Sequence, residues 1–394
     1  MSELLNNAGI GARLRWNLLA GTSALALAAY AALGSASAED DTLPSVWIDL
    51  GGQVEQIGGL SNPFTAPFMT AVAPTPAPYR DDIFVKGQEP ARFAFGLDGK
   101  ATFRPKDSDW IVSLGIRYGR SQAKRHIHHQ TDTPTAITTV YKGYPTYGYK
   151  QVTARVGTAA IADVKTTYQE SHTIIDFQAG KDVGLGILGR NGTSNLNVGV
   201  RFAQFQAKSS SAMNGLPSVG IDSLYSAKYG ANLTPNFHQY TMHANAVRSF
   251  SGVGAILSWN ASAALVGQPE SGELAIDFGV NAAVLFGRQK AKTDHTTQSY
   301  HNYYTQTNGP YHYYHEHHLV YSPRASHSTR FRNVAVPNIG GYAGLSWKWP
   351  NAAVNLGYRY DAFLNAMDIG IDSTKKSTLS FHGPYASISI GLGG

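Results

Sequence analysis

Three arginines stand at the same place in a repeated seven-residue phrase, and they are the residues of this chain with the clearest chemical use. The phrases are Val112–Tyr118, Leu196–Phe202 and Val354–Tyr360, in which the arginines are Arg117, Arg201 and Arg359. Side chains of an extended strand alternate between two faces, so each arginine shares a face with a glycine while the large apolar side chains take the other face. A guanidinium held on such a face can attract an anion or pair with a carboxylate.

Aspartates occupy the same polar face in other strand-like segments. They are Asp49, Asp98, Asp176, Asp277 and Asp361. If the apolar faces point outward, all of these charged groups must point inward, because a slip of one residue would exchange the two faces completely. The sequence therefore predicts that the three arginines and the five aspartates line the interior of a barrel. They form either a charged constriction that conducts small hydrated solutes or a paired lattice that fills the interior.

Segments with one apolar face recur along the chain and must position these charged groups. In the segment 257–265, leucine, tryptophan and alanine alternate with serine and asparagine, and the segment 276–286 has the same period of two. The better segments are about 9 to 11 residues long, which is the length of a tilted strand that spans a membrane. A soluble sandwich would bury the same faces against a second sheet, so these segments alone leave both architectures open.

The N-terminus favours export. Two arginines precede an apolar run at 18–33, which ends in Ala-Ser-Ala at 36–38. A positively charged start, a short apolar run and small residues at its end are the three parts of a secretory signal peptide. We therefore expect residues 1–38 to be a signal peptide that is cleaved near Ala38, and residues 39–394 to form a single outer-membrane β-barrel domain.

The connections between the apolar-faced segments come in two sizes. Short turns are expected at 105–108, 189–194, 268–272 and 350–351. Long polar loops are expected near 58–90, 122–170, 208–254, 292–333 and 368–378. Short turns on one rim and long loops on the other are the layout of a bacterial outer-membrane barrel. We predict an all-β, transmembrane, antiparallel up-and-down barrel of about ten strands, with short periplasmic turns and long extracellular loops; twelve strands are the alternative.

The cysteine content and the net charge limit the crosslinks and the binding partners that are expected. The chain has no cysteine, which excludes a disulfide framework. Its formal charge is +6, from 32 lysines and arginines against 26 carboxylates, and it becomes 30 minus 25, or +5, without the predicted leader. An exported chain with scattered basic residues is not expected to bind nucleic acid. We expect contacts with outer-membrane lipid and lipopolysaccharide, a mild preference for anions in any pore, and no cofactor.

Histidines gather outside the apolar-faced segments, mainly in a tyrosine-rich stretch at 292–333. The candidates for binding zinc or copper are His312, His315, His317 and His318. Their spacing is not that of a fixed ligand set, so the preferred interpretation is a recognition loop without a metal. The sequence places no complete set of nucleophile, base and orienting group together, and we expect no enzymatic activity.

Four phrases follow one another along the mature chain. They are Ile-Asp-Phe-Gln-Ala-Gly-Lys-Asp-Val-Gly-Leu-Gly at 175–186, Val-Gly-Val-Arg-Phe-Ala-Gln-Phe at 198–205, Leu-Phe-Gly-Arg-Gln-Lys at 285–290 and Gly-Pro-Tyr-Ala-Ser-Ile-Ser-Ile-Gly-Leu at 383–392. In these phrases, and over most of its mature length, the chain resembles the Legionella-type major outer membrane protein family. The resemblance implies a pore-forming outer-membrane barrel whose surface loops are available for contacts with other cells. The chain departs from many outer-membrane barrels in ending on glycines rather than on an aromatic residue.

Two functions follow from these patterns. The first is a porin, an outer-membrane pore for the passive diffusion of small hydrophilic solutes. The second is a closed barrel that serves as a surface adhesin or structural scaffold through its tyrosine- and histidine-rich loops. Arginines that line a passage favour the first function, and arginines locked by the aspartates favour the second.

Overall fold

The computed structural model describes residues 45–60, 93–105, 108–141, 150–184, 193–226, 230–268, 271–308 and 313–392. The predicted signal peptide at 1–38 and most of the predicted loop at 58–90 lie outside these residues. Every regular element within the described part of the chain is a β-strand. None of the described residues forms a helix long and apolar enough to cross a membrane.

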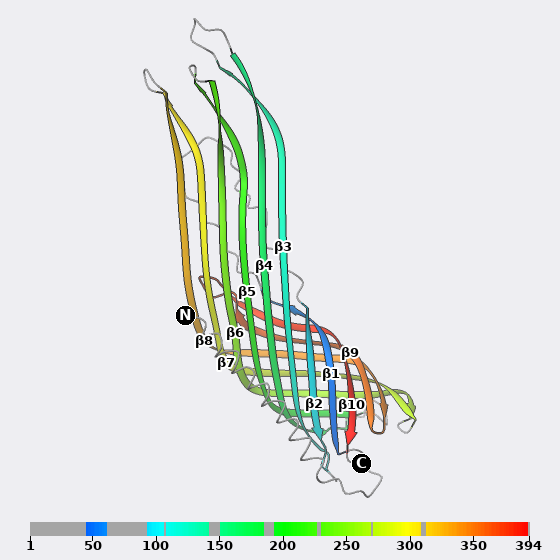
Figure 1. The fold of residues 1–394 in the computed structure, drawn as a ribbon. Helices are drawn as coiled ribbons and strands as arrows, with labels where there is room; N and C mark the ends of the chain where they lie inside the picture. The colour runs from blue at the N-terminus through cyan, green and yellow to red at the C-terminus, as the bar shows by residue number, and fades with distance from the viewer. Residues whose placement is uncertain are drawn as a thin grey trace, which may run out of the picture.

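Ten strands make up the fold (Figure 1). Their bounds are β1 Val46–Gly58, β2 Phe93–Phe103, β3 Trp110–Tyr141, β4 Lys150–Asp182, β5 Thr193–Ser226, β6 Gly230–Gln268, β7 Gly272–Asn308, β8 Tyr313–Trp349, β9 Ala352–Asp368 and β10 Lys376–Leu392. Consecutive strands pair antiparallel, and β10 pairs with β1 to close the ring. The predicted all-β, antiparallel up-and-down barrel is confirmed, and the ring closes with ten strands rather than twelve.

A belt of apolar side chains covers the outer surface of the closed part of the barrel. Phe95, Leu97 and Phe286 are exposed by 77%, 68% and 65%, and they come from two distant strands of the ring, β2 and β7. A continuous band of this kind is not stable against water, whereas an outward apolar band is what a barrel presents to lipid. The belt marks the membrane-spanning part of the chain, and the predicted outward direction of the apolar faces is confirmed.

The connections on one rim are short, as predicted. They join β2 to β3, β4 to β5, β6 to β7 and β8 to β9. Gly267 and Gly272 flank the β6–β7 turn with φ of 105° and 114°, a backbone conformation that glycine adopts without steric cost. The start of β1 and the end of β10 lie on this same rim, where Val46 pairs with Leu392. Both ends of the barrel on one rim require an even number of strands.

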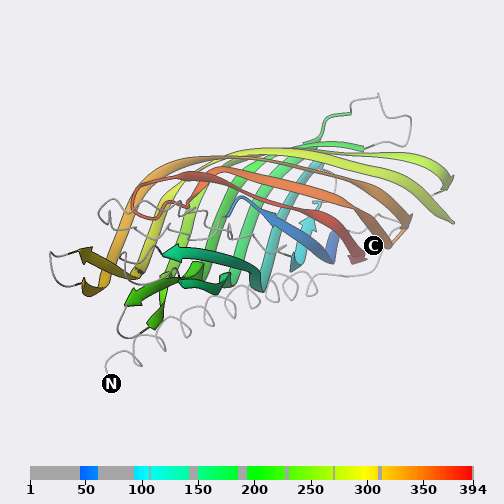
Figure 2. The ribbon, with the colours of Figure 1, turned by 90° about the horizontal axis from the view of Figure 1, so that it is seen from above.

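The largest difference from the sequence prediction lies at the other rim. There β3 to β8 continue far beyond the four short strands β1, β2, β9 and β10 (Figures 1 and 2). The sequence predicts loops near 122–170, 208–254 and 292–333, yet most of these residues are paired as strands. Strand signals in a sequence depend on one apolar face, and a strand that leaves the membrane can be polar on both faces. The polar ribbons therefore give no period-two signal.

These extensions form a six-stranded open sheet on the predicted extracellular side. Beyond Ser121, β3 pairs only with β4, and before Asn338, β8 pairs only with β7 in the described part of the chain. The segment Tyr240–Arg248, whose faces are mixed in the sequence, belongs to the inner strand β6 of this sheet. The closed barrel thus carries a tall wall on one side only, formed by β3 to β8.

Candidate functional site in the barrel lumen

All eight charged residues that the sequence assigns to the interior lie inside the closed barrel. Seven of them line a chamber of about 670 Å³: Asp49, Asp98, Asp176, Asp277, Arg117, Arg201 and Arg359. The eighth, Asp361, is buried and contacts Arg117. The chamber reaches the rim of short turns, where Trp47, Arg104 and Trp349 also line it. The inward direction of the eight charged side chains follows from the outward direction of the apolar belt, because alternate residues of each strand point to opposite faces.

Arg201 on β5 is the hub of the charged network. Its Nε and Nη2 atoms donate to the two carboxylate oxygens of Asp176 on β4, at 2.7 and 2.6 Å. Its Nη1 atom donates to the side-chain oxygen of Asn281, at 2.9 Å, and to that of Asn338. The side chain is almost fully buried. These four donor contacts replace the water that a guanidinium otherwise binds, and the fork geometry to Asp176 is the strong form of this pair.

A second pair crosses the lumen. Arg117 on β3 donates from Nη1 to Asp361 on β9 at 2.5 Å, although β2, β1 and β10 lie between these two strands in the ring. The other carboxylate oxygen of Asp361 lies 3.9 Å from Nη1 of Arg201. Asp176, Arg201, Asp361 and Arg117 therefore form one chain of alternating charges from wall to wall, which we call the charged bar.

Arg359, the third arginine of the repeated phrase, is held less tightly. Its guanidinium carbon lies 4.8 Å from the ring centre of Tyr385, and its Nη1 lies 3.9 Å from Asp98. A Cβ at Gly357 would collide with the β8 backbone at Ala343, and it would also lie 2.8 Å from Cε1 of Tyr385. At Gly199 a Cβ would collide with the β4 backbone. The glycine of the phrase thus permits close strand packing in both copies, and in one of them it also makes room for the tyrosine ring.

The lining of the chamber carries a small positive excess. Six cationic side chains and four aspartates line it, giving 6 minus 4, or +2, and +1 if Asp361 behind Arg117 is included. The cations are Lys100, Arg104, Arg117, Arg201, Lys348 and Arg359. Lys348 is partly neutralised, since it donates to Asp277 at 2.9 Å. The field inside the chamber therefore favours anions only mildly.

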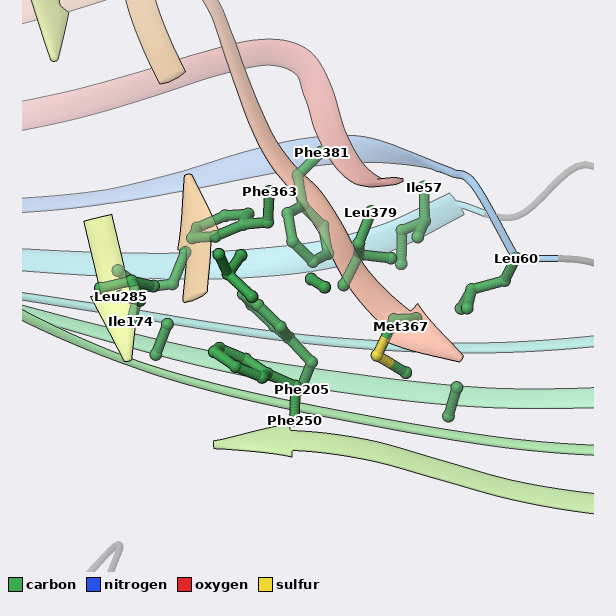
Figure 3. Packing of buried hydrophobic residues seen from close by; sticks show 14 of the residues in the cluster. Ile57, Leu60, Ile174, Phe205, Phe250, Leu285, Phe363, Met367, Leu379 and Phe381 are labelled. Atoms are coloured by element: carbon green, nitrogen blue, oxygen red, sulfur yellow. The ribbon is translucent and has the colours of Figure 1, made fainter. Parts of the chain in front are cut away.

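Beyond the charged bar, the inner face of the barrel becomes apolar. Figure 3 shows Phe205 and Phe250 approaching Phe363 and Phe381 across the interior. We call this cluster the apolar layer; its buried members are Ile57, Leu60, Ala94, Ile174, Ala203, Phe205, Ala207, Phe250, Ile256, Ala283, Leu285, Val336, Phe363, Ala366, Met367, Leu379 and Phe381. Sequence reasoning did not identify these residues, because it assigned the large apolar side chains to the lipid-facing surface.

Rings from opposite walls are in contact within the apolar layer. The ring centre of Phe205 on β5 lies 4.6 Å from that of Phe363 on β9 and 5.7 Å from that of Phe381 on β10. In the ring of ten strands, β5 and β10 are five places apart and therefore face each other. All three side chains are almost fully buried. Aromatic rings from opposite walls therefore meet in the lumen between the chamber and the extracellular sheet.

One ionisable pair is embedded in the apolar layer. Glu55 on β1 and His172 on β4 lie 3.2 Å apart, and both are buried. The ring of His172 also lies 4.2 Å from that of Phe381. Gly119 allows this arrangement, because a Cβ there would lie 2.2 Å from Cε1 of His172. The pair brings together side chains of two strands that are not neighbours in the ring.

The turn between β9 and β10, residues 369–375, lies on the inner face of the wall above the apolar layer, and we call it the latch. Arg330 on β8 donates to the carbonyl oxygens of Ile371 and Gly370 at 2.6 and 2.8 Å. The same guanidinium donates to Asp368, at the end of β9, at 3.0 Å. A single arginine thus binds two carbonyl oxygens of the latch and the carboxylate that flanks it.

Two further strands hold the latch. Arg248 on β6 donates to the carbonyl oxygen of Ile369 at 3.0 Å. Thr293 on β7 donates to that of Ile371 at 2.8 Å. Because β9 and β10 carry Phe363 and Phe381, these bonds fix the two strands that complete the apolar layer.

Acid is expected to loosen the latch. Asp372 shares a hydrogen bond with the ring of His295 at 2.9 Å, and this bond holds the pKa of Asp372 below its ordinary value of 3.8. A carboxyl group whose pKa is lowered by folding stabilises the folded form above its unfolded pKa, and this contribution is lost as pH falls through the lowered pKa. Hydrogen exchange at 369–375, corrected for intrinsic rates, should therefore show protection at pH about 6 and a loss below about 3.8. Asp372→Asn should lose protection already at the higher pH, and latch protection that persists in both cases would contradict this.

The histidine candidates for a metal are not placed by side chain. His312 lies outside the described residues, and the side chains of His315, His317 and His318 lie outside the described part of β8. Among the described residues, no group of three or more histidines, cysteines or carboxylates could hold a metal ion. A metal site on this segment stays a prediction.

Comparisons with known proteins give structural likeness only. No family model matches the chain, and no curated protein matches it. Among solved structures, the transport unit of the autotransporter AIDA-I from Escherichia coli is 9% identical, over 90% of this chain and 93% of that one, with a TM-score of 0.24. The toluene transporter TbuX from Ralstonia pickettii is 7% identical over 89% and 90%, with a TM-score of 0.19.

A third similar structure is a deltaS2 mutant of the TodX monoaromatic hydrocarbon channel. It is 10% identical, over 88% of this chain and 90% of that one, with a TM-score of 0.17. Identities and TM-scores this low transfer neither a substrate nor a mechanism to this chain.

Proposed function

We propose that the protein is an outer-membrane channel for small hydrophilic solutes, with a mild preference for anions, and that the lumen described above is its closed state. The observation that carries this proposal is the chamber of about 670 Å³ lined by charged and amide side chains. A barrel kept only as a scaffold is packed by its own side chains and needs no such space. The phrases that resemble the Legionella-type major outer membrane protein family support the same function.

Closure by the apolar layer fits a gated channel. A constriction lined by apolar side chains excludes water and therefore stops hydrated ions, even where it is wide enough for them. Opening requires Phe363 and Phe381 to separate from Phe205. Phe363 lies on β9 and Phe381 on β10, and the latch joins these two strands. Release of the latch is then the step that opens the lumen.

The test is planar-bilayer conductance of purified, refolded protein. The wild type should show rare, brief openings, and Arg330→Gln should raise the open probability at least tenfold, because it removes three donors to the latch and its flanking strand. Arg332→Gln is the matched control, since Arg332 is exposed on the same strand. Its openings should equal those of the wild type. Reversal potentials in a salt gradient should show a weak preference for chloride.

A specific observation favours a second function, a closed scaffold that makes surface contacts. Rings from opposite walls meet in the apolar layer, and a six-stranded sheet stands beyond it. If the wild type, Arg330→Gln and variants of the apolar layer are all silent at every voltage, the channel is excluded and this function takes its place. Removal of 300–321, the end of the β7–β8 ribbon that starts at the Tyr300–Tyr321 pair, should then abolish cell contacts without preventing barrel assembly.

A further inference from the structure

The outer face of β7 changes abruptly from apolar to basic. Its outward residues Val280, Val284 and Phe286 are exposed, and the next two outward positions are Arg288 and Lys290, also exposed. β7 leaves the apolar belt at this point and continues into the extracellular sheet. The two cations therefore lie at the level where the outer leaflet meets water.

Both cations converge on one aromatic ring of β8. The guanidinium carbon of Arg288 lies 4.4 Å, and Nζ of Lys290 5.5 Å, from the ring centre of Phe331. Contacts of this kind orient the cations before a ligand arrives, which reduces the ordering cost of binding. Among the described residues, neither cation forms an ion pair with a carboxylate, whereas Lys292 lies 3.8 Å from Asp294. The two positive charges at the ring are free for an anion.

A shallow hollow adjoins the two cations on the same outer surface. It is lined by Phe286, Gly287, Arg288, Asn333, Val334 and Ala335. In the ladder between β7 and β8, Arg288 pairs with Asn333 and Phe286 with Ala335. Polar donors therefore stand on the extracellular side of the hollow, and apolar side chains stand on its membrane side. This polarity matches an amphiphile with an anionic head and an acyl chain.

We propose that Arg288, Lys290 and the adjoining hollow bind a phosphorylated lipid of the outer leaflet. The phosphate meets Arg288, whose guanidinium suits two phosphate oxygens at once, and Lys290 as a second positive charge. The acyl chain lies over Phe286, and the small side chain of Ala335 leaves room for it. The site faces lipid rather than the lumen, so it does not depend on whether the barrel conducts.

The experiment measures lipid-dependent stabilisation of the refolded barrel in uncharged detergent. A diphosphorylated glycolipid should raise the midpoint of thermal unfolding of the wild type in a saturable manner, and the same glycolipid without phosphates should not. Arg288→Gln with Lys290→Gln should weaken the apparent affinity at least tenfold. The matched control is Lys208→Gln, which removes an exposed outward cation of β5 and should bind as the wild type does.

A second variant separates the lipid from its head group. Ala335→Trp fills the hollow while leaving both cations, and it should also weaken glycolipid binding severalfold. If inorganic phosphate at the same concentration stabilises the wild type as well as the glycolipid does, the site takes free phosphate and the lipid proposal fails. It fails equally if the double variant, with unchanged unfolding in detergent alone, still binds the glycolipid like the wild type.

Discussion

Replacing Phe205 by alanine is expected to convert rare openings into steady conduction and to lower the free energy of unfolding by about 3 to 5 kcal/mol. Phe205 touches both Phe363 and Phe381, so its removal leaves a gap between the two walls of the apolar layer. Polar groups lie on both sides of that layer, and water that enters the gap connects them. Planar-bilayer recording measures the conduction, and denaturant titration in lipid vesicles measures the stability.

Two control variants isolate the effect of the lumen. Phe177→Ala deletes the same side chain from an exposed, lipid-facing position on β4 and should leave the channel closed. Phe205→Leu refills most of the gap, so it should restore closure and most of the lost stability. If Phe205→Ala loses stability but stays silent, the apolar layer is a structural core rather than a gate.

The barrel itself was predictable because the membrane imposes a strict pattern. Alternation assigns Arg201 and Asp176 to the interior once the apolar faces point to lipid, and the structure places both there. The number of strands followed from short turns on one rim. The extracellular ribbons were not predictable by the same rule, because strands such as 122–141 have no apolar face that distinguishes them from a loop.

The apolar layer carried a signal that alternation alone could have exposed. Phe205 is four residues after Arg201, and Phe363 is four residues after Arg359, so each phenylalanine shares the inner face of its arginine. An apolar side chain at an inward position is the exception to the lipid-facing pattern. A sequence pattern cannot predict contacts across the barrel, because these depend on how the strands pair and close. Phe205, for example, contacts Phe381, which is 176 positions later in the chain.

No sequence signal predicts that the latch lies against the inner wall of the barrel. The sequence predicts a polar connection near 368–378, and a polar connection of this length normally lies at the surface. Here it lies against the inner wall because Arg248, Thr293 and Arg330, from three different strands, satisfy its carbonyl oxygens. Such partners are found only after the strands are placed side by side.

Arg201→Gln should destabilise the barrel by about 3 to 5 kcal/mol, the range for breaking a buried ion pair by removing one partner. Most of this loss of stability comes from Asp176 and Asp361 rather than from the ion pair itself. Both carboxylates stay in the interior after the arginine that they share has been removed. Arg359→Gln, in the equivalent place of its phrase, should lose only about 1 kcal/mol, because that arginine makes one aromatic contact and one long ion pair. Unfolding titrations of the two variants under the same conditions measure the difference.

Combining Arg201→Glu with Asp176→Asn tests whether the charged bar is a structural lattice or a selectivity filter. In a lattice, Arg201→Glu mainly lowers stability, because it puts a third carboxylate beside Asp176 and Asp361. Asp176→Asn should then recover part of the loss, and a thermodynamic cycle over the two sites should give a coupling of about 1 to 3 kcal/mol. In a filter, the cycle is nearly additive and the reversal potential moves toward cations instead. The Arg201 guanidinium is fixed by two hydrogen bonds to Asp176 and by one to each of its two asparagine partners. We therefore expect a large coupling energy between the two sites. The shift in ion selectivity should appear only when Phe205→Ala has also opened the lumen.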